Sequence, residues 1–351
     1  MSITVEPAPT VTETDIFGNP LGRGGYARDG RGSALVVTTD PFDVYKSGAK
    51  KGMLKTYAYK AASSIGISTS TEGLDQWKQN RLLLATIIDP DLTTRLFHAM
   101  DGINPESDEG KAVFRTFRDE AHELAETQIA ATRGSFAHWL TECADNGESP
   151  LEGLAHGEAI GIDPGTAERI IAGWEAVNIE FGFKALAVEA KIVNDEAKAA
   201  GTTDRVVELT KPLTVTIGGE SVVLPVGTIV IVDFKSGKLR RAQRTGLPQY
   251  WHKYAAQIAT YAGGHPYDPK NHVRMAWTDI GVPARPSQEV GFIVHADLEA
   301  LADGTSGADP REAFSVFALD LGVGREYAAA SNLLRATESG AGKSFSLVEV
   351  G

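Results

Sequence analysis

Cysteine, long apolar runs and an excess of positive charge are all missing from this chain of 351 residues. Its single cysteine, Cys143, excludes an internal disulfide and a cysteine-held iron–sulfur cluster. No apolar run approaches the length of about 18 residues that a membrane span needs. The segment 1–15 is polar and acidic, which argues against a secretory signal. A cytoplasmic protein is therefore expected.

The formal net charge of −12 argues against a protein that coats nucleic acid, because phosphates repel an acidic surface. Two segments, 44–71 and 234–267, nevertheless contain no acidic residue. Their basic residues are Lys46, Lys50, Lys51, Lys55 and Lys60 in the first, and Lys235, Lys238, Arg240, Arg241, Arg244 and Lys253 in the second. This distribution is typical of a protein that contacts phosphate along one groove, although solvated loops explain either segment alone.

The order of the expected elements indicates an α/β or α+β fold with a central mixed sheet flanked by helices. Apolar residues three and four apart predict helices over 74–88, about 110–144 and 164–183, with Asp163 as an N-cap before Pro164. Later helices are expected over 250–262 and 325–338. Short β-branched segments predict strands over 34–39, 185–193, 203–209, 213–217, 221–226, 227–234, 273–280 and 289–296. We therefore expect a loop-rich arm (1–33), a mainly helical region (34–130) and a core with a C-terminal helix (131–351).

Three polar residues sit at the ends of apolar strands. Asp204 begins one strand, whereas Asp233 ends the strand GTIVIVDF and is followed two positions later by Lys235. Residues i and i+2 of a strand point to one face, so Asp233 and Lys235 project together. Two converging carboxylates suit Mg²⁺, and a nearby lysine offsets charge on a phosphate. An Asp–Lys ion pair at a strand end is the plainer alternative.

Further polar residues stand at regular spacings around these three. Gln257 and Tyr261 lie four apart in an expected helix, with Tyr250 and Tyr254 on nearly the same face, a stripe that offers rings and hydrogen bonds to a nucleic-acid strand. His138 closes the helical segment GSFAH, where a histidine is more often structural. Glu189 is a carboxylate in the middle of an expected apolar strand. It either faces outward by simple alternation or belongs to the site.

In their order these elements resemble the RecB-type nucleases of the PD-(D/E)XK superfamily, most closely the phage-encoded RecB-like exonucleases. The elements are G-x-x-x-H (134–138), the strand Glu189, G-x-x-D-R (201–205), D-F-K-S-G (233–237) and Q-x-x-x-Y (257–261). The resemblance covers roughly residues 130–265. It implies a PD-(D/E)XK core and a Mg²⁺-dependent DNA exonuclease in phage-type recombination, replication or repair, located in the host cytoplasm. It also implies that Mn²⁺ replaces Mg²⁺ and that a single-strand annealing protein is a partner.

The resemblance also assigns roles to individual positions. Asp204 and Asp233 would bind the metal together with His138 and the backbone carbonyl of Phe234, and Glu189 would act through a metal-bound water or a second ion. Lys235 would be the catalytic lysine. The residues expected to contact DNA are Gln257, Tyr261, Tyr254, Lys238, Arg240, Arg241, Arg244, Lys50, Lys51 and Lys55.

Two departures from the family pattern stand out. The gap between Asp204 and Asp233 is longer than the motif needs, and VTIGGESVV (215–223) predicts a hairpin inserted there. The four cysteines that hold an iron–sulfur cluster in several relatives are missing. No bound nucleotide is expected either, because GAGKS (340–344) lacks the first glycine of a phosphate-binding loop. A structure-specific endonuclease and a non-cleaving DNA-binding module remain as alternatives.

Overall fold

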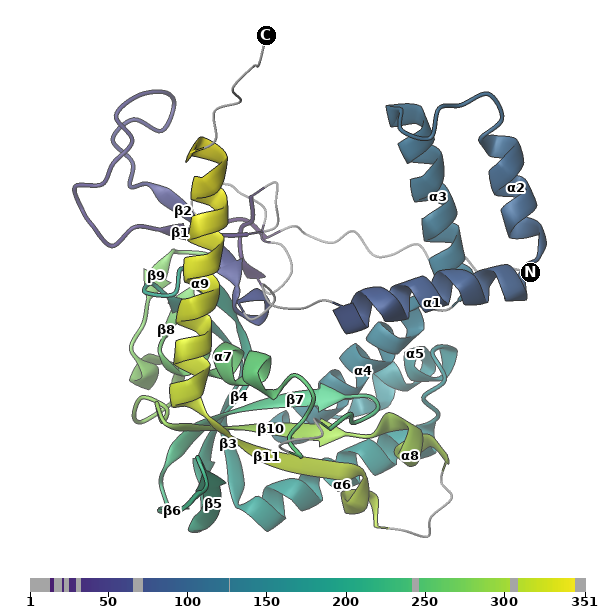
Figure 1. Cartoon of the computed structure of the whole chain (residues 1–351). Helices are drawn as coiled ribbons and strands as arrows, with labels where there is room; N and C mark the ends of the chain where they lie inside the picture. The colour runs from purple at the N-terminus through teal and green to yellow at the C-terminus, as the bar shows by residue number, and fades with distance from the viewer. Residues whose placement is uncertain are drawn as a thin grey trace.

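The computed structural model describes residues 13–15, 21, 25–29, 33–65, 72–125, 127–241, 246–303 and 309–344. Within these ranges the chain has an α+β fold, in which helices cover both faces of a mixed β-sheet (Figure 1). The expected fold class is confirmed at this level. No described helix combines the length and the apolar content that a membrane-crossing segment needs.

The main sheet has the spatial order β11-β10-β7-β4-β3-β8-β9, and the β1–β2 pair joins it at β4. Its strands are β1 (Ala34–Val37), β2 (Thr56–Ala61), β3 (Phe183–Asn194), β4 (Ala199–Leu209), β7 (Ile229–Ser236), β8 (His265–Asp268), β9 (Val273–Arg274), β10 (Val290–Ala296) and β11 (Phe314–Asp320). The central strand β7 is antiparallel to β4 and parallel to β10. A separate hairpin, β5 (Leu213–Ile217) and β6 (Glu220–Leu224), connects β4 to β7.

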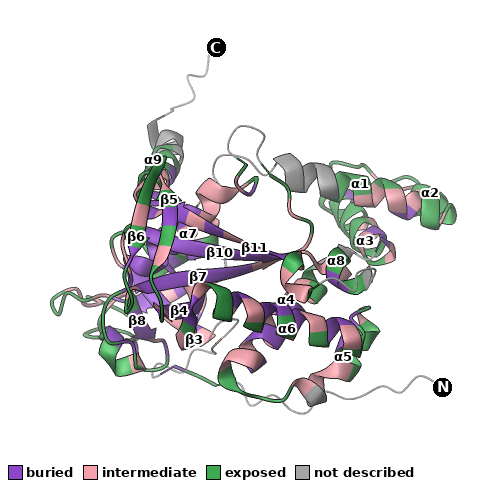
Figure 2. Cartoon of the chain, turned by 90° about the horizontal axis from the view of Figure 1, so that it is seen from below, coloured by how far each residue is buried: buried purple, intermediate pink, exposed green. Residues whose placement is uncertain are grey.

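Helices lie on both sides of this sheet. They are α1 (Glu72–Ile88), α2 (Asp91–Ala99), α3 (Asp108–Leu124), α4 (Thr127–Asn146), α5 (Leu154–Ala159), α6 (Pro164–Phe181), α7 (Trp251–Ala262), α8 (Leu298–Asp303) and α9 (Leu321–Ser344). Short 3-10 helices cover Ala62–Ser64, Pro150–Gly153, Trp277–Ile280 and Pro310–Ala313. Helices α4 and α6 pack on one face, and α7 with the start of α9 packs on the other. Figure 2 shows β4, β7 and β10 as buried strands in the middle of the molecule.

The side chains of β7 alternate between the two apolar clusters of the core. Val230, Val232 and Phe234 pack in the cluster with α4 and α6, whereas Ile229 and Ile231 pack in the cluster with α7. This alternation is the period-two pattern of a strand buried on both faces. The positions that follow in the same series, 233 and 235, therefore lie on the α7 face of the sheet.

Several local predictions are confirmed. Asp163 caps α6 by accepting a 3.0 Å hydrogen bond from the backbone N–H of Thr166, with Pro164 at the first helical position. The inserted hairpin is also present. Its turn contains Gly218 and Gly219, which both have positive φ angles, 59° and 90°, that fit the twist of a two-residue hairpin turn.

The strand predicted over 273–280 is wrong. Only Val273–Arg274 is strand, and Trp277–Ile280 forms a 3-10 helix. The Asp279 carboxylate accepts a hydrogen bond from the N–H of Ala276, and Gly281 turns the chain away at a φ of 80°. These local contacts compete with strand pairing for the backbone.

The structure also contains strands and α-helices that the pattern did not predict, namely β2, β8, β11, α2, α5 and α8. The helical stretch expected over about 110–144 is two helices, α3 and α4. Figure 1 shows α1, α2 and α3 grouped to one side of the sheet. In the N-terminal arm, the buried Tyr26 donates a hydrogen bond at 3.0 Å to the carbonyl oxygens of Ile192 and Gly201, so part of the arm packs against the sheet.

Candidate active site

The central feature of the site is the point where strands β4 and β7 separate. Their backbone pairing runs from Glu208–Ile229 to Arg205–Val232, and Asp204 and Asp233 are the next residues. Beyond that last pair, the N–H of Phe234 donates a 2.7 Å hydrogen bond to Oδ2 of Asp204. The Asp204 carboxylate thus accepts a hydrogen bond from a backbone N–H that could have continued the pairing of β4 with β7. Asp204 and Asp233 therefore face each other where the two strands part.

Asp233 and Lys235 form an ion pair on the α7 face of β7. Their Oδ2 and Nζ atoms are 2.5 Å apart, and Asp233 is 1% exposed. Burial raises the pKa of Asp233, while Lys235 opposes this by favouring the carboxylate. Burial also disfavours the ammonium, but attraction to Asp233 and Asp204 outweighs it and raises the pKa of Lys235. The expected convergence of these two side chains is therefore present.

His138 reaches the site from α4, on the other face of the sheet. Its Nδ1 is 3.5 Å from Oδ2 of Asp204, and its ring meets the Phe234 ring edge-on at 4.8 Å between centroids. Burial, followed by the charge of Lys235, lowers the pKa of His138 to about 4. The imidazole is therefore neutral near pH 7 and keeps a lone pair for a ligand.

Glycine at position 134 allows α4 to approach the end of β7. A Cβ there would lie 3.0 Å from Oγ of Ser236, which is tighter than most contacts of this kind. Gly134 and Ser236 belong to the two motifs that carry His138 and Lys235. The glycine of G-x-x-x-H thus has a packing reason: it brings the histidine close to the D-F-K-S-G strand.

Glu189 lies directly across from Asp204 in the neighbouring strand β3. The pairs Val188–Arg205 and Ala190–Thr203 flank these two residues, so Glu189, Asp204 and Asp233 form one row across β3, β4 and β7. Glu189 has a φ of 52°, a left-handed conformation that is uncommon outside glycine and is often found at functional sites.

The surroundings of Glu189 favour its protonated form. Although Glu189 is exposed by surface area, desolvation raises the pKa of its carboxyl group, and the charges of Asp204 and Glu142 raise it further, to about 7. Glu189 also shares a hydrogen bond with Glu142, whose own pKa is raised by burial and by Asp204. Glu142 was not predicted. Its position four residues after His138, on the same face of α4, is the signal that could have identified it.

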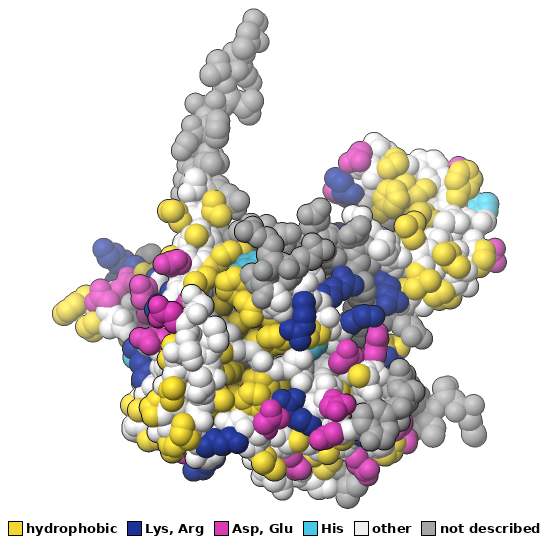
Figure 3. Space-filling model, turned by 60° about the horizontal axis from the view of Figure 1, so that its bottom comes forward, with side chains coloured by type: hydrophobic (Ala, Val, Ile, Leu, Met, Phe, Trp, Pro, Cys, Tyr) yellow, Lys and Arg dark blue, Asp and Glu magenta, His cyan; other side chains and the backbone are white. Residues whose placement is uncertain are grey.

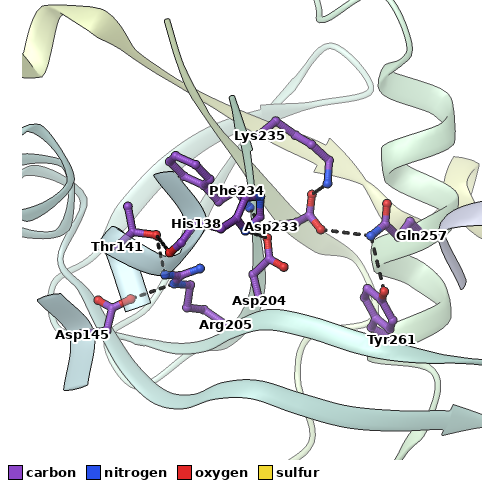
Figure 4. Close-up of polar contacts among 10 residues, drawn as sticks. All are labelled: His138, Thr141, Asp145, Asp204, Arg205, Asp233, Phe234, Lys235, Gln257 and Tyr261. Atoms are coloured by element: carbon purple, nitrogen blue, oxygen red, sulfur yellow. Dashed lines mark hydrogen bonds and ion pairs between the residues drawn. The ribbon is translucent and has the colours of Figure 1, made fainter. Parts of the chain in front are cut away.

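Gln257 and Tyr261 complete the α7 side of the site. The Gln257 amide donates to Oδ1 of Asp233 at 3.1 Å and lies 3.4 Å from the Tyr261 hydroxyl (Figure 4). Tyr261 is only 3% exposed, so its hydroxyl faces Gln257 and the sheet. A Cβ at Gly201 would lie 2.9 Å from that hydroxyl. The glycine of G-x-x-D-R therefore makes room for the tyrosine of Q-x-x-x-Y.

Arg205 links the sheet to α4 beneath the site. Its fully buried side chain donates to Oδ2 of Asp145 at 2.7 Å and to Oγ1 of Thr141 at 2.6 Å. The Thr141 hydroxyl in turn donates to the carbonyl oxygen of His138 at 2.7 Å (Figure 4). The Trp174 indole donates to Asp145 as well. This network fixes the turn of α4 that carries His138, a role that the sequence pattern did not reveal.

Compared with models of protein families and with curated protein sequences, the chain matches none at a significant level.

The donor set suits a hard divalent cation. It consists of carboxylate oxygens from Asp204, Asp233 and Glu189 and one neutral imidazole, from His138, and Mg²⁺ prefers oxygen ligands. In the described part of the chain, no three His, Cys, Asp or Glu side chains are yet arranged around one point to hold an ion. Asp233 instead faces Lys235 and Gln257, and Asp204 faces the Phe234 amide.

The basic residues expected to contact DNA lie in two places. Lys238, Arg240 and Arg241 follow β7 and are exposed, whereas Arg244 lies outside the described residues. Lys50, Lys51 and Lys55 lie on the connection between β1 and β2, which projects away from the sheet in Figure 1. They are not among the side chains around Asp233. DNA contacts at both places stay a prediction.

Tyr254, another residue expected to contact DNA, lies close to Lys235. It lies on α7 and is partly buried, and Nζ of Lys235 is 5.5 Å from the centre of its ring. A cation over an aromatic ring is held in place by the ring's negative face. Tyr254 therefore helps to restrain the Lys235 side chain, which Asp233 also holds.

Proposed function

We propose that this chain is a Mg²⁺-dependent deoxyribonuclease that hydrolyses phosphodiester bonds, with an exonuclease favoured over an endonuclease. The observation that carries the proposal is the meeting of Asp204, Asp233, Lys235 and His138 where β4 and β7 part. Paired aspartates beside a lysine are a common arrangement for cleaving phosphate esters with a metal ion.

The topology supports a PD-(D/E)XK core as the finer fold assignment. Along the chain, α4, α5 and α6 precede the strands β3, β4 and β7, in which β4 is antiparallel to both of the others. Helix α7 follows on the opposite face, and β10, which comes after β8 and β9, is parallel to β7. The motif residues of the resemblance fall on these elements, with Lys235 on β7 and Gln257 on α7. The hairpin β5–β6 is an insertion between β4 and β7.

Asp204 and Asp233 would hold Mg²⁺, or Mn²⁺ in its place, with His138, the Phe234 carbonyl and Glu189 as further ligands. A bound ion of this kind acidifies a coordinated water and neutralises phosphate oxygens. Exchange of the Asp233–Lys235 ion pair for an ion would free the lysine ammonium. Lys235 can then donate hydrogen bonds to a phosphate oxygen on which charge develops.

The other residues position this set. The Gln257 amide fixes the Asp233 carboxylate by the 3.1 Å hydrogen bond, and the buried Tyr261 supports Gln257 from behind. Arg205 holds the turn of α4 that carries His138, through Thr141. Each of these contacts restricts the reacting groups before substrate binds, so less orientational entropy is lost on binding.

The proposal is tested with end-labelled linear DNA and closed circular DNA, each incubated with Mg²⁺ or with EDTA. An exonuclease shortens linear DNA in Mg²⁺ only and leaves closed circles intact. Cutting of circles would favour a structure-specific endonuclease of the same fold. If neither substrate is cut, the chain is not the enzyme proposed, and a non-cleaving DNA-binding module becomes the better assignment. The proposed setting is phage-type recombination, replication or repair, with a single-strand annealing protein as partner.

A further inference from the structure

The sheet continues past Lys235 to a histidine that the proposed chemistry does not use. In the parallel pairing of β7 and β10, His295 is the direct partner of Lys235, and Ile293 is the partner of Asp233. Ile293 packs in the cluster with α7, so position 295, two residues later, lies on the same face. Neighbouring strands are about 4.8 Å apart. His295 therefore stands beside Lys235, one strand further from Asp204.

His295 is buried among charged groups of both signs. The residue is 7% exposed, and burial lowers the pKa of its imidazole. Of the charged groups that act on it, Asp297 opposes this effect, whereas Arg241 and Lys235 lower the pKa further. The imidazole is therefore neutral near pH 7 and can donate one N–H to an anionic oxygen without carrying charge itself.

Arg241 extends the same face to the next strand, β11. Its guanidinium lies 4.9 Å from the centre of the Phe317 ring, and Phe317 pairs with Ile293. One guanidinium N–H donates to the carbonyl oxygen of Gly246 at 2.9 Å, which leaves the remaining donors of the fork to other groups. The residue is exposed, and Figure 3 shows Lys and Arg side chains gathered on one part of the face in view.

We propose that His295 and Arg241 form a second phosphate-binding subsite, which takes the phosphate next to the one held over Asp233 and Lys235 on the same DNA strand. The inference rests on the proposed function and deepens it. DNA offers a phosphate about every 3.4 Å of axis along each strand, so a neighbouring contact at the adjacent β-strand is within reach. Arg241 supplies the charge and His295 supplies a directed hydrogen bond.

The test is equilibrium binding of a labelled duplex in EDTA, measured by fluorescence anisotropy over a range of salt concentrations. Arg241→Ala should lower the magnitude of the slope of log K against log salt by about 0.9, the value for one phosphate contact. His295→Ala should weaken binding several-fold and leave the slope unchanged. Because both residues contact one phosphate, the double variant should bind no more than about twofold more weakly than Arg241→Ala.

Two matched variants serve as controls. His265→Ala removes an exposed histidine from β8, and Lys211→Ala removes an exposed cation beyond the far end of β4. Both should bind as the unaltered protein does. If Arg241→Ala and His295→Ala also bind like the controls while Mg²⁺-dependent cleavage is intact, the subsite is refuted and the proposed function stands. Absence of both DNA binding and cleavage in the unaltered protein refutes both.

Discussion

The amide of Phe234 donates its hydrogen bond to the carboxylate of Asp204 at the position where the β4–β7 ladder ends. This contact joins the two motif strands through a side chain and leaves Asp204 and Asp233 opposite each other. It also fixes the Asp204 carboxylate to the backbone of the residue that follows Asp233. The proposed reaction would take place where these two strands part.

Asp204→Asn and Asp233→Asn should each abolish Mg²⁺-dependent cleavage of linear DNA, because an amide is a weak metal ligand compared with a carboxylate. The measurement is the rate of shortening of an end-labelled duplex, and circular dichroism checks that each variant is folded. Asp119→Asn, at an aspartate whose side chain is 67% exposed on α3, is the control and should cleave normally. Normal cleavage by either site variant would remove that residue from the mechanism.

Lys235→Gln should reduce cleavage by a factor of at least about 100, which is the scale of losing one electrostatic contact to the developing charge. The loss should appear in kcat more than in KM, since the ammonium acts where charge develops. Lys184→Gln is the control, because that side chain is 60% exposed and pairs with Glu208 on the surface. An unchanged kcat in Lys235→Gln would contradict the assignment.

Arg205→Ala should destabilise the fold by about 3–5 kcal/mol, because it leaves the Asp145 carboxylate buried without its cation. Urea denaturation measures the loss. Glu180→Ala breaks the pair with Arg311 at a side chain that is 53% exposed, so it should cost less than about 1 kcal/mol. Equal effects of the two substitutions would show that Arg205 is not the link between the sheet and α4.

Gly201→Ala should lower cleavage without removing any proposed ligand. The added methyl group would lie 2.9 Å from the Tyr261 hydroxyl, so Tyr261 must move, and Gln257 loses its support. Tyr261→Phe removes the same hydroxyl from Gln257 and should lower the activity as well. The comparison is made by kcat at saturating DNA. If Gly201→Ala cleaves at the unaltered rate, the proposed coupling between these motifs does not exist.

Cleavage should weaken as the pH falls through about 7, the pKa to which Glu189 is raised. Because the pKa of Glu189 is raised, the side chain is a carboxylate only above this pH. Below it the carboxyl group takes up a proton and loses a ligand oxygen. More Mg²⁺ should then be needed for half-maximal cleavage at acidic pH. Glu189→Gln should show a smaller dependence of the Mg²⁺ requirement on pH, whereas an unchanged dependence would assign the effect to another group.

The sequence predicts the parts of this site that depend on local periodicity. Asp233 and Lys235 share a face because they are two apart in a strand, and the N-cap at Asp163 follows from its neighbours. The left-handed conformation of Glu189 and the buried Arg205–Asp145 pair depend on contacts between distant segments, which a single sequence does not reveal. The register that places His295 beside Lys235 is likewise a property of strand pairing.

The most direct test of the central claim is a Mn²⁺ titration, in which electron paramagnetic resonance counts the free ion in the presence of the unaltered chain, Asp204→Asn and Asp233→Asn. If the two aspartates hold a divalent cation together, the unaltered chain should deplete free Mn²⁺ and both variants should bind it far more weakly. Equal binding by all three proteins, or none by the unaltered chain, would contradict the account.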